Sequence, residues 1–335
     1  SMTLGEDIIG FLETLPIPEG KLVGKPMKLM DFQKRFILDV YDNPAHTKTA
    51  ILSMARKNGK TALIAGLLLA HLVGPAAVLN SQIISGAMSR DQASLVFKLA
   101  QKIINQSGML QDVIKVIPSQ KSLIGLPMNV EYRAIAADGR TAQGLSPVLV
   151  IFDEAGQIKG PQNDFYEALV TSQGAHDHPL MINISTQAPT DADLLSIMID
   201  DAKAGDDPRT VCHVYEAPEE CDVLDREAWA TANPALGVFR SMQDMEDLAN
   251  AASRMPSKEN SYRNLNLNQR VNAEAPFVSP QEWKACIADY DETPFLEGVV
   301  WGGLDLSMKT DLTAFVMLAE YEGKFYTKAE IYTPK

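Results

Sequence analysis

A short run of residues suited to phosphate binding, Gly59-Lys60-Thr61, lies between two apolar stretches. We predict a strand from Thr49 to Met54, a tight turn, and a helix from Ala62 to Val73. In such a turn, backbone N–H groups and the positive end of the helix face an anion, the lysine adds charge for the β- and γ-phosphates, and the threonine hydroxyl can bind Mg²⁺. Met54 replaces the first glycine of the common pattern, so an ordinary strand, turn and helix is the alternative for this segment taken alone. The residues predicted to bind the nucleotide are Lys57, Asn58, Gly59, Lys60 and Thr61.

A second element further along the chain supplies matching acids. The apolar run from 147 to 152 ends in Asp153 and Glu154. A continuous apolar run is typical of a parallel strand buried on both faces, and the carboxyl ends of such strands share one sheet edge with the phosphate-binding turn. We therefore expect Asp153 to hold Mg²⁺ and Glu154 to orient the attacking water. Two acids at a solvated strand end are the alternative, but both motifs together predict ATP hydrolysis.

Composition sets broad limits on the class of protein. A chain of 335 residues that is 46% hydrophobic can bury a large core and can hold more than one domain. The longest apolar stretch, near 63–73, is too short to cross a bilayer, and no signal peptide precedes it, so we expect a cytosolic protein with no membrane partner. The three scattered cysteines favour neither a zinc site nor a disulfide framework. The net charge of −13 weakens the case for a nucleic-acid partner without excluding it, because lysines and arginines can gather on one face.

Strand and helix patterns alternate from Thr49 to about Glu216. An amphipathic helix is predicted before them, at 29–40, and the clearest helix between strands is predicted at 89–100. This alternation predicts an α/β fold with a mainly parallel sheet in three layers. The strands are expected near 50–55, 77–84, 129–136, 147–152, 180–186 and 210–216.

The pattern changes after residue 217. A segment rich in proline and acidic residues at 217–222 is followed by helical sequence from about Asp225 to Asn272. From residue 297 the sequence again favours strands, at 299–306, 313–321 and 324–332. We therefore predict three parts: residues 1–217 with a helical lead-in and the nucleotide site, a mostly helical linker at 218–296, and the first strands of another domain at 297–335.

Taken together, these motifs resemble the large terminase subunit of tailed bacteriophages, and the resemblance spans nearly the whole chain. The turn from Ala55 to Thr61 looks like that family's version of the phosphate loop, which tolerates a start other than glycine and carries a basic residue. Asp153 and Glu154 look like its magnesium aspartate and catalytic glutamate. The resemblance implies an ASCE-type P-loop NTPase domain, a helical linker and a ribonuclease-H-like nuclease domain.

The resemblance implies roles for further residues. Ser185, Thr186 and Gln187 resemble the coupling motif that senses the γ-phosphate, and Gln33 matches a glutamine that reads the adenine edge. A solvated glutamine is the alternative for Gln33. The segments at 233–237 and 262–268 also resemble landmarks of the linker, for which we expect a structural role.

Two arginines are candidates for catalysis. Arg140, in the polar loop before the acidic strand, is similar in position to the family's arginine finger, which acts on a neighbouring subunit. Its charge would stabilise the transition state of phosphoryl transfer. Arg56, inside the turn, could contribute in the same subunit. A surface or DNA-facing arginine is the alternative for both.

The last segment is similar to the opening strand of the family's nuclease. Asp305 and Asp311 could begin a site for two Mg²⁺ or Mn²⁺ ions, which activate water and stabilise the leaving oxygen of a phosphodiester. The family draws its other metal carboxylates from later strands, which this sequence does not contain. We therefore expect an incomplete nuclease site.

The resemblance implies a motor that moves double-stranded DNA into procapsids in the host cytoplasm, with portal protein and small terminase subunit as partners. Subunits would form a homo-oligomeric ring during packaging. One alternative is a superfamily-2 helicase, but no second nucleotide-binding domain follows residue 217. Another is a scaffold that binds ATP without hydrolysing it, which Glu154 argues against.

Overall fold

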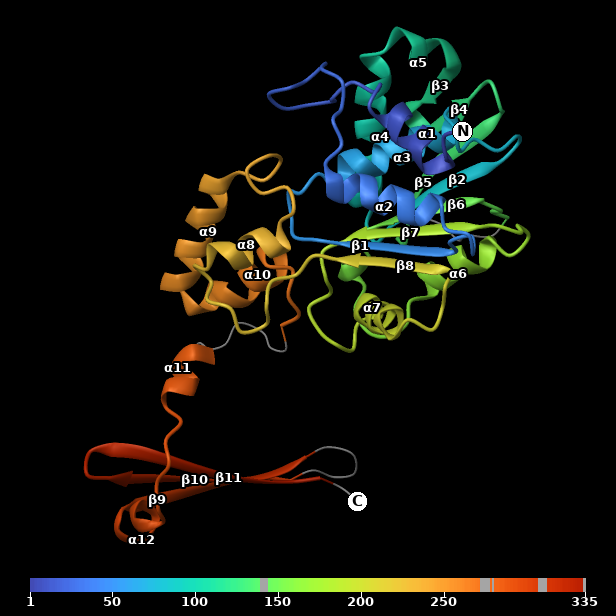
Figure 1. The fold of residues 1–335 in the computed structure, drawn as a ribbon. Helices are drawn as coiled ribbons and strands as arrows, with labels where there is room; N and C mark the ends of the chain where they lie inside the picture. The colour runs from blue at the N-terminus through green and yellow to red at the C-terminus, as the bar shows by residue number, and fades with distance from the viewer. Residues whose placement is uncertain (139–143, 272–277, 279, 307–311, 334–335) are drawn as a thin grey trace. The chain divides into compact units, whose positions relative to one another are not determined.

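The chain forms two separate units in a computed structural model, Ser1–Phe277 and Val278–Lys335. The structure describes residues 1–138, 144–271, 278, 280–306 and 312–333, and Figure 1 colours them from the N- to the C-terminus. Each unit contains its own sheet.

An eight-stranded sheet is the centre of the first unit, in the order β3-β4-β5-β2-β6-β7-β1-β8. Six strands run parallel, and the two short strands at one edge, β3 and β4, pair antiparallel. The α/β, mainly parallel prediction is therefore confirmed. The strands are β1 (Thr49–Ser53), β2 (Gln82–Ala87), β3 (Ile114–Ile117), β4 (Ser122–Gly125), β5 (Val130–Ala136), β6 (Leu149–Asp153), β7 (Leu180–Ser185) and β8 (Thr210–Val214).

Helices cover both faces of this sheet, which gives the predicted three layers (Figure 1). Residues of α1 to α4 pack with Leu52, Ile151 and Ile182 in one apolar core, and residues of α6 and α7 pack with Ile51 and Phe152 in a second. Neighbouring strand residues thus face opposite layers, as the pleat requires. The helices are α1 (Leu4–Leu12), α2 (Asp31–Tyr41), α3 (Lys60–Leu72), α4 (Arg90–Asn105), α5 (Gly108–Val113), α6 (Asp164–Ser172) and α7 (Leu194–Ala204), with short 3₁₀ turns at Pro118–Gln120 and Ala155–Gln157.

A helical segment follows β8 within the same unit. It contains α8 (Arg226–Ala232), α9 (Met242–Arg254) and α10 (Pro256–Asn266). Trp229, Met245 and Tyr262 are buried in its own small apolar core, which also includes Ala55 from the turn after β1. The helical segment, residues 226–270, therefore packs directly against the predicted phosphate loop.

The second unit holds a three-stranded antiparallel sheet in the order β11-β10-β9. Its strands are β9 (Val299–Asp305), β10 (Thr313–Tyr321) and β11 (Lys324–Tyr332), with the short helices α11 (Pro280–Ala285) and α12 (Thr293–Glu297) before them. All three strands were predicted from the sequence. None of the described helices of either unit is long and apolar enough to span a membrane.

Some elements differ from the sequence predictions. Strand β2 begins at Gln82, whereas we predicted a start at 77, because Asn80 adopts a left-handed conformation (φ 57°) in the preceding turn. Helix α1, helix α5 and the strands β3 and β4 were not predicted. The two strands have four residues each, too few to show a clear period.

A glycine in β4 provides a test of how closely sheet and helix pack. A Cβ atom at Gly125 would lie 2.2 Å from the backbone oxygen of Leu72, the last residue of α3. We expect Gly125→Ala to lower the free energy of unfolding by about 1–3 kcal/mol, because backbone must move to make room. Gly10→Ala in α1 is the matched control, since no atom lies within 4 Å of its added methyl group. Equal stability of the two variants in chemical denaturation would contradict this packing.

Candidate functional site

The turn between β1 and α3 places a lysine at the carboxyl edge of the sheet. Gly59 has a φ of 82° and precedes Lys60, the first residue of α3. Lys60 is only 8% exposed, and its Nζ lies 3.3 Å from the backbone oxygen of Met54 and 3.3 Å from Glu154 Oε1. Thr61 follows on the first turn of the helix. Lys60 and Glu154 are far apart in the sequence, and they form an ion pair at this edge of the sheet, where we predicted that they would meet.

Asp153, the last residue of β6, is a buried carboxylate with one amide partner. It is 3% exposed, and Gln92 Nε2 in α4 donates to its Oδ2 at 2.7 Å. Burial, followed by the charge of Glu154, raises the pKa of Asp153 to about 6. A carboxylate in such a position is stabilised by a cation, so its chemistry fits the predicted magnesium ligand.

Glu154 is held in an unusual backbone conformation. Its φ is 56°, in the left-handed region that residues other than glycine rarely adopt. Its N–H donates to Ile184 O at 3.1 Å, and Thr186 Oγ1 donates to its Oε2 at 3.2 Å. Ser185 Oγ lies 3.4 Å from the same oxygen but donates at 2.6 Å to Thr186 O. Strain of this kind is found at functional sites, and here the strained residue is the one whose carboxylate pairs with Lys60.

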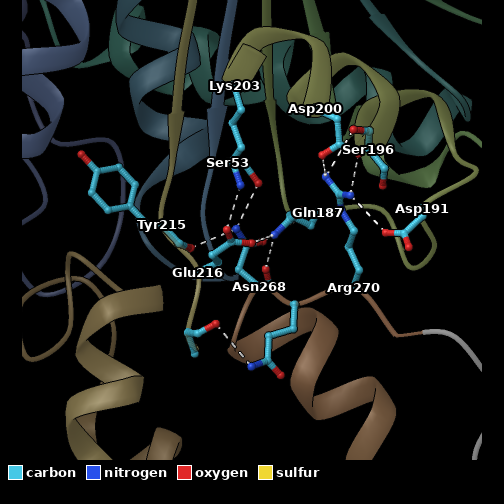
Figure 2. A network of polar contacts seen from close by, with 12 residues as sticks. Ser53, Gln187, Asp191, Ser196, Asp200, Lys203, Tyr215, Glu216, Asn268 and Arg270 are labelled. Atoms are coloured by element: carbon cyan, nitrogen blue, oxygen red, sulfur yellow. Dashed lines mark hydrogen bonds and ion pairs between the residues drawn. The ribbon is translucent and has the colours of Figure 1, made fainter. Parts of the chain in front are cut away.

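Gln187 ties the end of β7 to the end of α10 (Figure 2). Its N–H donates to Asn268 Oδ1 at 2.8 Å, and its Nε2 donates to Asn268 O at 2.7 Å and to Glu216. Arg270 Nε donates to Gln187 Oε1 at 3.0 Å. With both ends of its amide hydrogen-bonded, Gln187 is 1% exposed and links the predicted coupling motif to the helical segment.

Asn268 joins the ends of three strands. Its Nδ2 donates to Ser53 Oγ in β1 and to Tyr215 O after β8, both at 3.0 Å, while its Oδ1 accepts from Gln187 after β7. The residue is fully buried with a φ of 53°. Figure 2 shows these contacts beside those of Arg270 with Asp191 and Asp200.

Other predicted residues have different surroundings. Lys57 Nζ donates to Asp244 Oδ2 in α9 at 2.9 Å, and Asn58 is fully buried against the helical segment. Arg56 has an exposed side chain. Gln33 is 3% exposed, and its Oε1 accepts from Met30 N at 2.9 Å, which caps α2.

Of the remaining predicted site residues, the structure describes only some. Arg140 and Asp311 lie outside the described residues. Asp305 is exposed at the end of β9 and pairs in register with Ala314. Within the described ranges, no three or more His, Cys, Asp or Glu side chains gather into a metal site.

Sequence reasoning missed Gln92, Asn233 and Asn268 as neighbours of the site. Gln92 could have been found, because Ser89 caps a helix that follows a parallel strand, and such helices begin at the edge where the acids lie. Asn233 and Asn268 are within segments that were singled out but expected to be merely structural. Their partners are distant in sequence, so no local pattern reveals them.

The order of the strands identifies the class of fold. Strand β7 lies between β1, which leads into the Gly-Lys-Thr turn, and β6, which ends in the two acids. This arrangement is that of a P-loop nucleoside triphosphatase fold. Residues 31–204 match the family model "Terminase large subunit, ATPase domain", and residues 205–335 match "Terminase large subunit, endonuclease domain". The chain belongs to the terminase large-subunit family, which favours the main interpretation over the helicase and scaffold alternatives.

Similar proteins agree with this assignment. The chain is 59% identical over 321 residues to the terminase large subunit of Enterobacteria phage HK97, covering 95% of this chain and 63% of that protein. The crystal structure of the HK97 large terminase superposes with a TM-score of 0.78 at 56% identity, over 100% of this chain and 69% of the other. The large terminase of bacteriophage D6E, solved with ADP, shares the fold with a TM-score of 0.50 at 11% identity, over 91% and 69% of the two chains. The chain thus spans less than two thirds of the curated HK97 protein.

The burial of Asp153 leads to a prediction about how stability depends on pH. Its pKa is raised to about 6 in the folded protein, so its contribution to stability is fully present below the unfolded pKa near 4 and is lost as pH rises through 6. Without Mg²⁺ or nucleotide, Asp153→Asn should therefore raise the free energy of unfolding at pH 8 by up to about 3 kcal/mol, and by much less at pH 4. Urea titrations at both pH values would measure this.

Asp200→Asn is the control, for which we expect the opposite effect on stability. The hydrogen bond from Arg270 lowers the pKa of Asp200, so its contribution is present above the unfolded pKa and is lost as pH falls. Removing that charge should destabilise the protein more at pH 8 than at pH 4. A loss of stability for Asp153→Asn at pH 8 would show that burial does not penalise its charge.

Proposed function

We propose that this chain binds ATP with Mg²⁺ at the edge formed by β1, β6 and β7 and hydrolyses it to move double-stranded DNA into a procapsid. The observation that carries the proposal is the ion pair between Lys60 and Glu154, beside a buried Asp153, at the end of three adjacent parallel strands. Lys60 supplies charge for phosphate, and Glu154 supplies a base. The family assignment and the existence of an ADP complex of the D6E protein support nucleotide binding by this chain.

The residues present fit a magnesium ion. Asp153 offers a carboxylate whose charge is costly without a cation, and Thr61 offers a hydroxyl oxygen from the first turn of α3. When bound, Mg²⁺ would neutralise charge on the β- and γ-phosphate oxygens. Gln92 would keep Asp153 oriented, because it donates to one of the two carboxylate oxygens.

The ion pair suggests how hydrolysis is linked to nucleotide binding. Lys60 neutralises Glu154 at 3.3 Å, and a γ-phosphate would compete for the same ammonium group. Glu154 would then keep the donor from Thr186 and be free to accept a proton from water. We therefore propose that the effect of γ-phosphate binding is transmitted to the helical segment through Ser185, Thr186 and Gln187. Arg56 would add positive charge from the turn.

Nucleotide specificity and the nuclease are further parts of the proposal. Gln33 could contribute its Nε2 donor to adenine, since its Oε1 already caps α2. The complete protein is proposed to cut concatemeric DNA with Mg²⁺ or Mn²⁺ at a site that begins with Asp305 and Asp311. Of these two carboxylates, Asp305 lies within the described residues. The proposed partners are the portal protein, the small terminase subunit and other copies in a ring, in the host cytoplasm.

Glu154→Gln tests the hydrolysis step. The amide cannot accept a proton, so phosphate release should fall by about 10²–10⁴-fold, while ATP should bind at least as tightly because Lys60 is no longer paired with Glu154. Lys60→Ala should instead weaken ATP binding itself. Glu167→Gln, an exposed acid in α6, is the control and should retain full activity. Unchanged phosphate release by Glu154→Gln would rule out this residue as the base.

Arg140 can be tested by mixing subunits. If it acts on a neighbour, Arg140→Ala and Glu154→Gln are each inactive, but a mixture contains interfaces with one intact Arg140 and one intact Glu154. DNA-stimulated ATP turnover of the mixture should then exceed the sum of the two variants measured alone. A mixture no faster than that sum, with ATP binding retained by both, would exclude a finger acting between subunits.

A further inference from the structure

The turn that we propose binds phosphate is also bonded to the helical segment 226–270, although the two are far apart in sequence. Ala55 N donates to Ala232 O at 3.2 Å, and Arg56 N donates to Leu265 O at 2.9 Å. Both partners belong to the first unit. Two backbone N–H groups at the start of the turn thus donate to helices α8 and α10, whereas such groups in a surface loop usually donate to water.

A pair of buried asparagine side chains makes the most specific contact. Asn58 Nδ2 donates to Asn233 Oδ1 at 2.8 Å, and Asn58 Oδ1 accepts from Ala235 N at 3.0 Å. Asn58 Nδ2 also lies 3.0 Å from the backbone oxygens of Ala55 and Arg56. One side chain therefore closes the turn on itself and anchors it to the helical segment.

Asn233 is in turn oriented by the helical segment alone. Its Nδ2 donates to Trp229 O in α8 and to Asn266 O at the end of α10, both at 2.9 Å. With Nδ2 committed to these two oxygens, its Oδ1 can point only at Asn58. Asn233 is 1% exposed and Asn58 is 0% exposed, so water cannot readily replace either partner.

Two further contacts surround the same turn. The ring of Phe239 lies 2.8 Å from where a Cβ atom of Gly59 would be, so only glycine fits there. Asp244 Oδ2 lies 2.9 Å from Lys57 Nζ and 3.1 Å from the NH1 nitrogen of the buried Arg240. The Lys57 pair is largely exposed and adds little energy, but it joins the turn to the same helical segment as the asparagine pair.

We propose that Asn233 is a positioning residue, which holds the phosphate-binding turn in its binding conformation through Asn58 and makes nucleotide affinity depend on the helical segment. This inference rests on the proposed function of the turn and adds to it. Nucleotide binding and the ordering of the helical segment would then be thermodynamically coupled, since each favours the same conformation of residues 55–59.

A double-mutant cycle with Asn58→Ala and Asn233→Ala in the whole chain tests the proposal. Each single variant should weaken ADP binding by about tenfold to a hundredfold, measured by calorimetry with Mg²⁺, because the turn loses its fixed geometry. The double variant should bind within about twofold of the weaker single variant, since both remove one connection. Tyr262→Phe is the matched control, because it removes another buried hydrogen bond of the helical segment, to Val223 O at 3.1 Å, and leaves the hydrogen bonds of the turn in place.

Hydrogen exchange without nucleotide gives a second readout. Amides of residues 54–61 should exchange faster in Asn233→Ala than in the wild type, and at the wild-type rate in Tyr262→Phe. Wild-type affinity or wild-type exchange in folded Asn233→Ala would overturn the inference, as would affinity losses in the single variants that simply multiply in the double. If wild-type protein binds no ADP or ATP, the proposed function fails, and the exchange experiment still decides whether Asn233 orders the turn.

Discussion

The structure of the site depends on a balance of charges at one edge of the sheet. Lys60 is buried between two acids, at 3.3 Å from Glu154 and close enough to Asp153 to affect its pKa. One positive and two negative groups leave a net negative charge in a region of low dielectric. A triphosphate adds further negative charge, so cations that bind with it would lower the electrostatic cost of its binding. This effect is a physical reason for a divalent metal and additional arginines in the proposed mechanism.

The order of the strands brings these charges together. Because β7 lies between β1 and β6, Ser53 is in register with Ser185, and Asp153 is in register with Ile184. The turn after β1, the residues after β7 and the two acids after β6 therefore leave the sheet at the same level. Asn268 forms hydrogen bonds with residues at the ends of β1, β7 and β8, so a single side chain connects three strand ends.

Much of this arrangement could be predicted from sequence, because its signals are local. The Gly-Lys-Thr turn, the apolar run before Asp153 and the alternation of strands and helices each need only a short window to be seen. The short strands β3 and β4 could not be predicted, since four residues carry no clear period. The bond between Asn58 and Asn233 could not be predicted either, because it joins residues 175 positions apart through amides that have no periodic pattern. The side-chain partners of Lys57 and Gln33 could not be predicted either: Lys57 Nζ pairs with Asp244 in α9, and Gln33 Oε1 caps the start of α2.

The turn and the helical segment are joined by amide hydrogen bonds, which fix their relative geometry. Apolar contacts would bind the two strongly but would allow many geometries, whereas amide hydrogen bonds require a defined distance and direction. Their net contribution to stability is modest, yet an unpaired buried amide is costly, so the asparagine pair favours either full contact or full separation. Amides carry no charge and do not titrate near neutral pH. The asparagine pair between the helical segment and the turn is therefore insensitive to the protonation changes that affect Asp153, so this contact holds the turn independently of the charge on that acid.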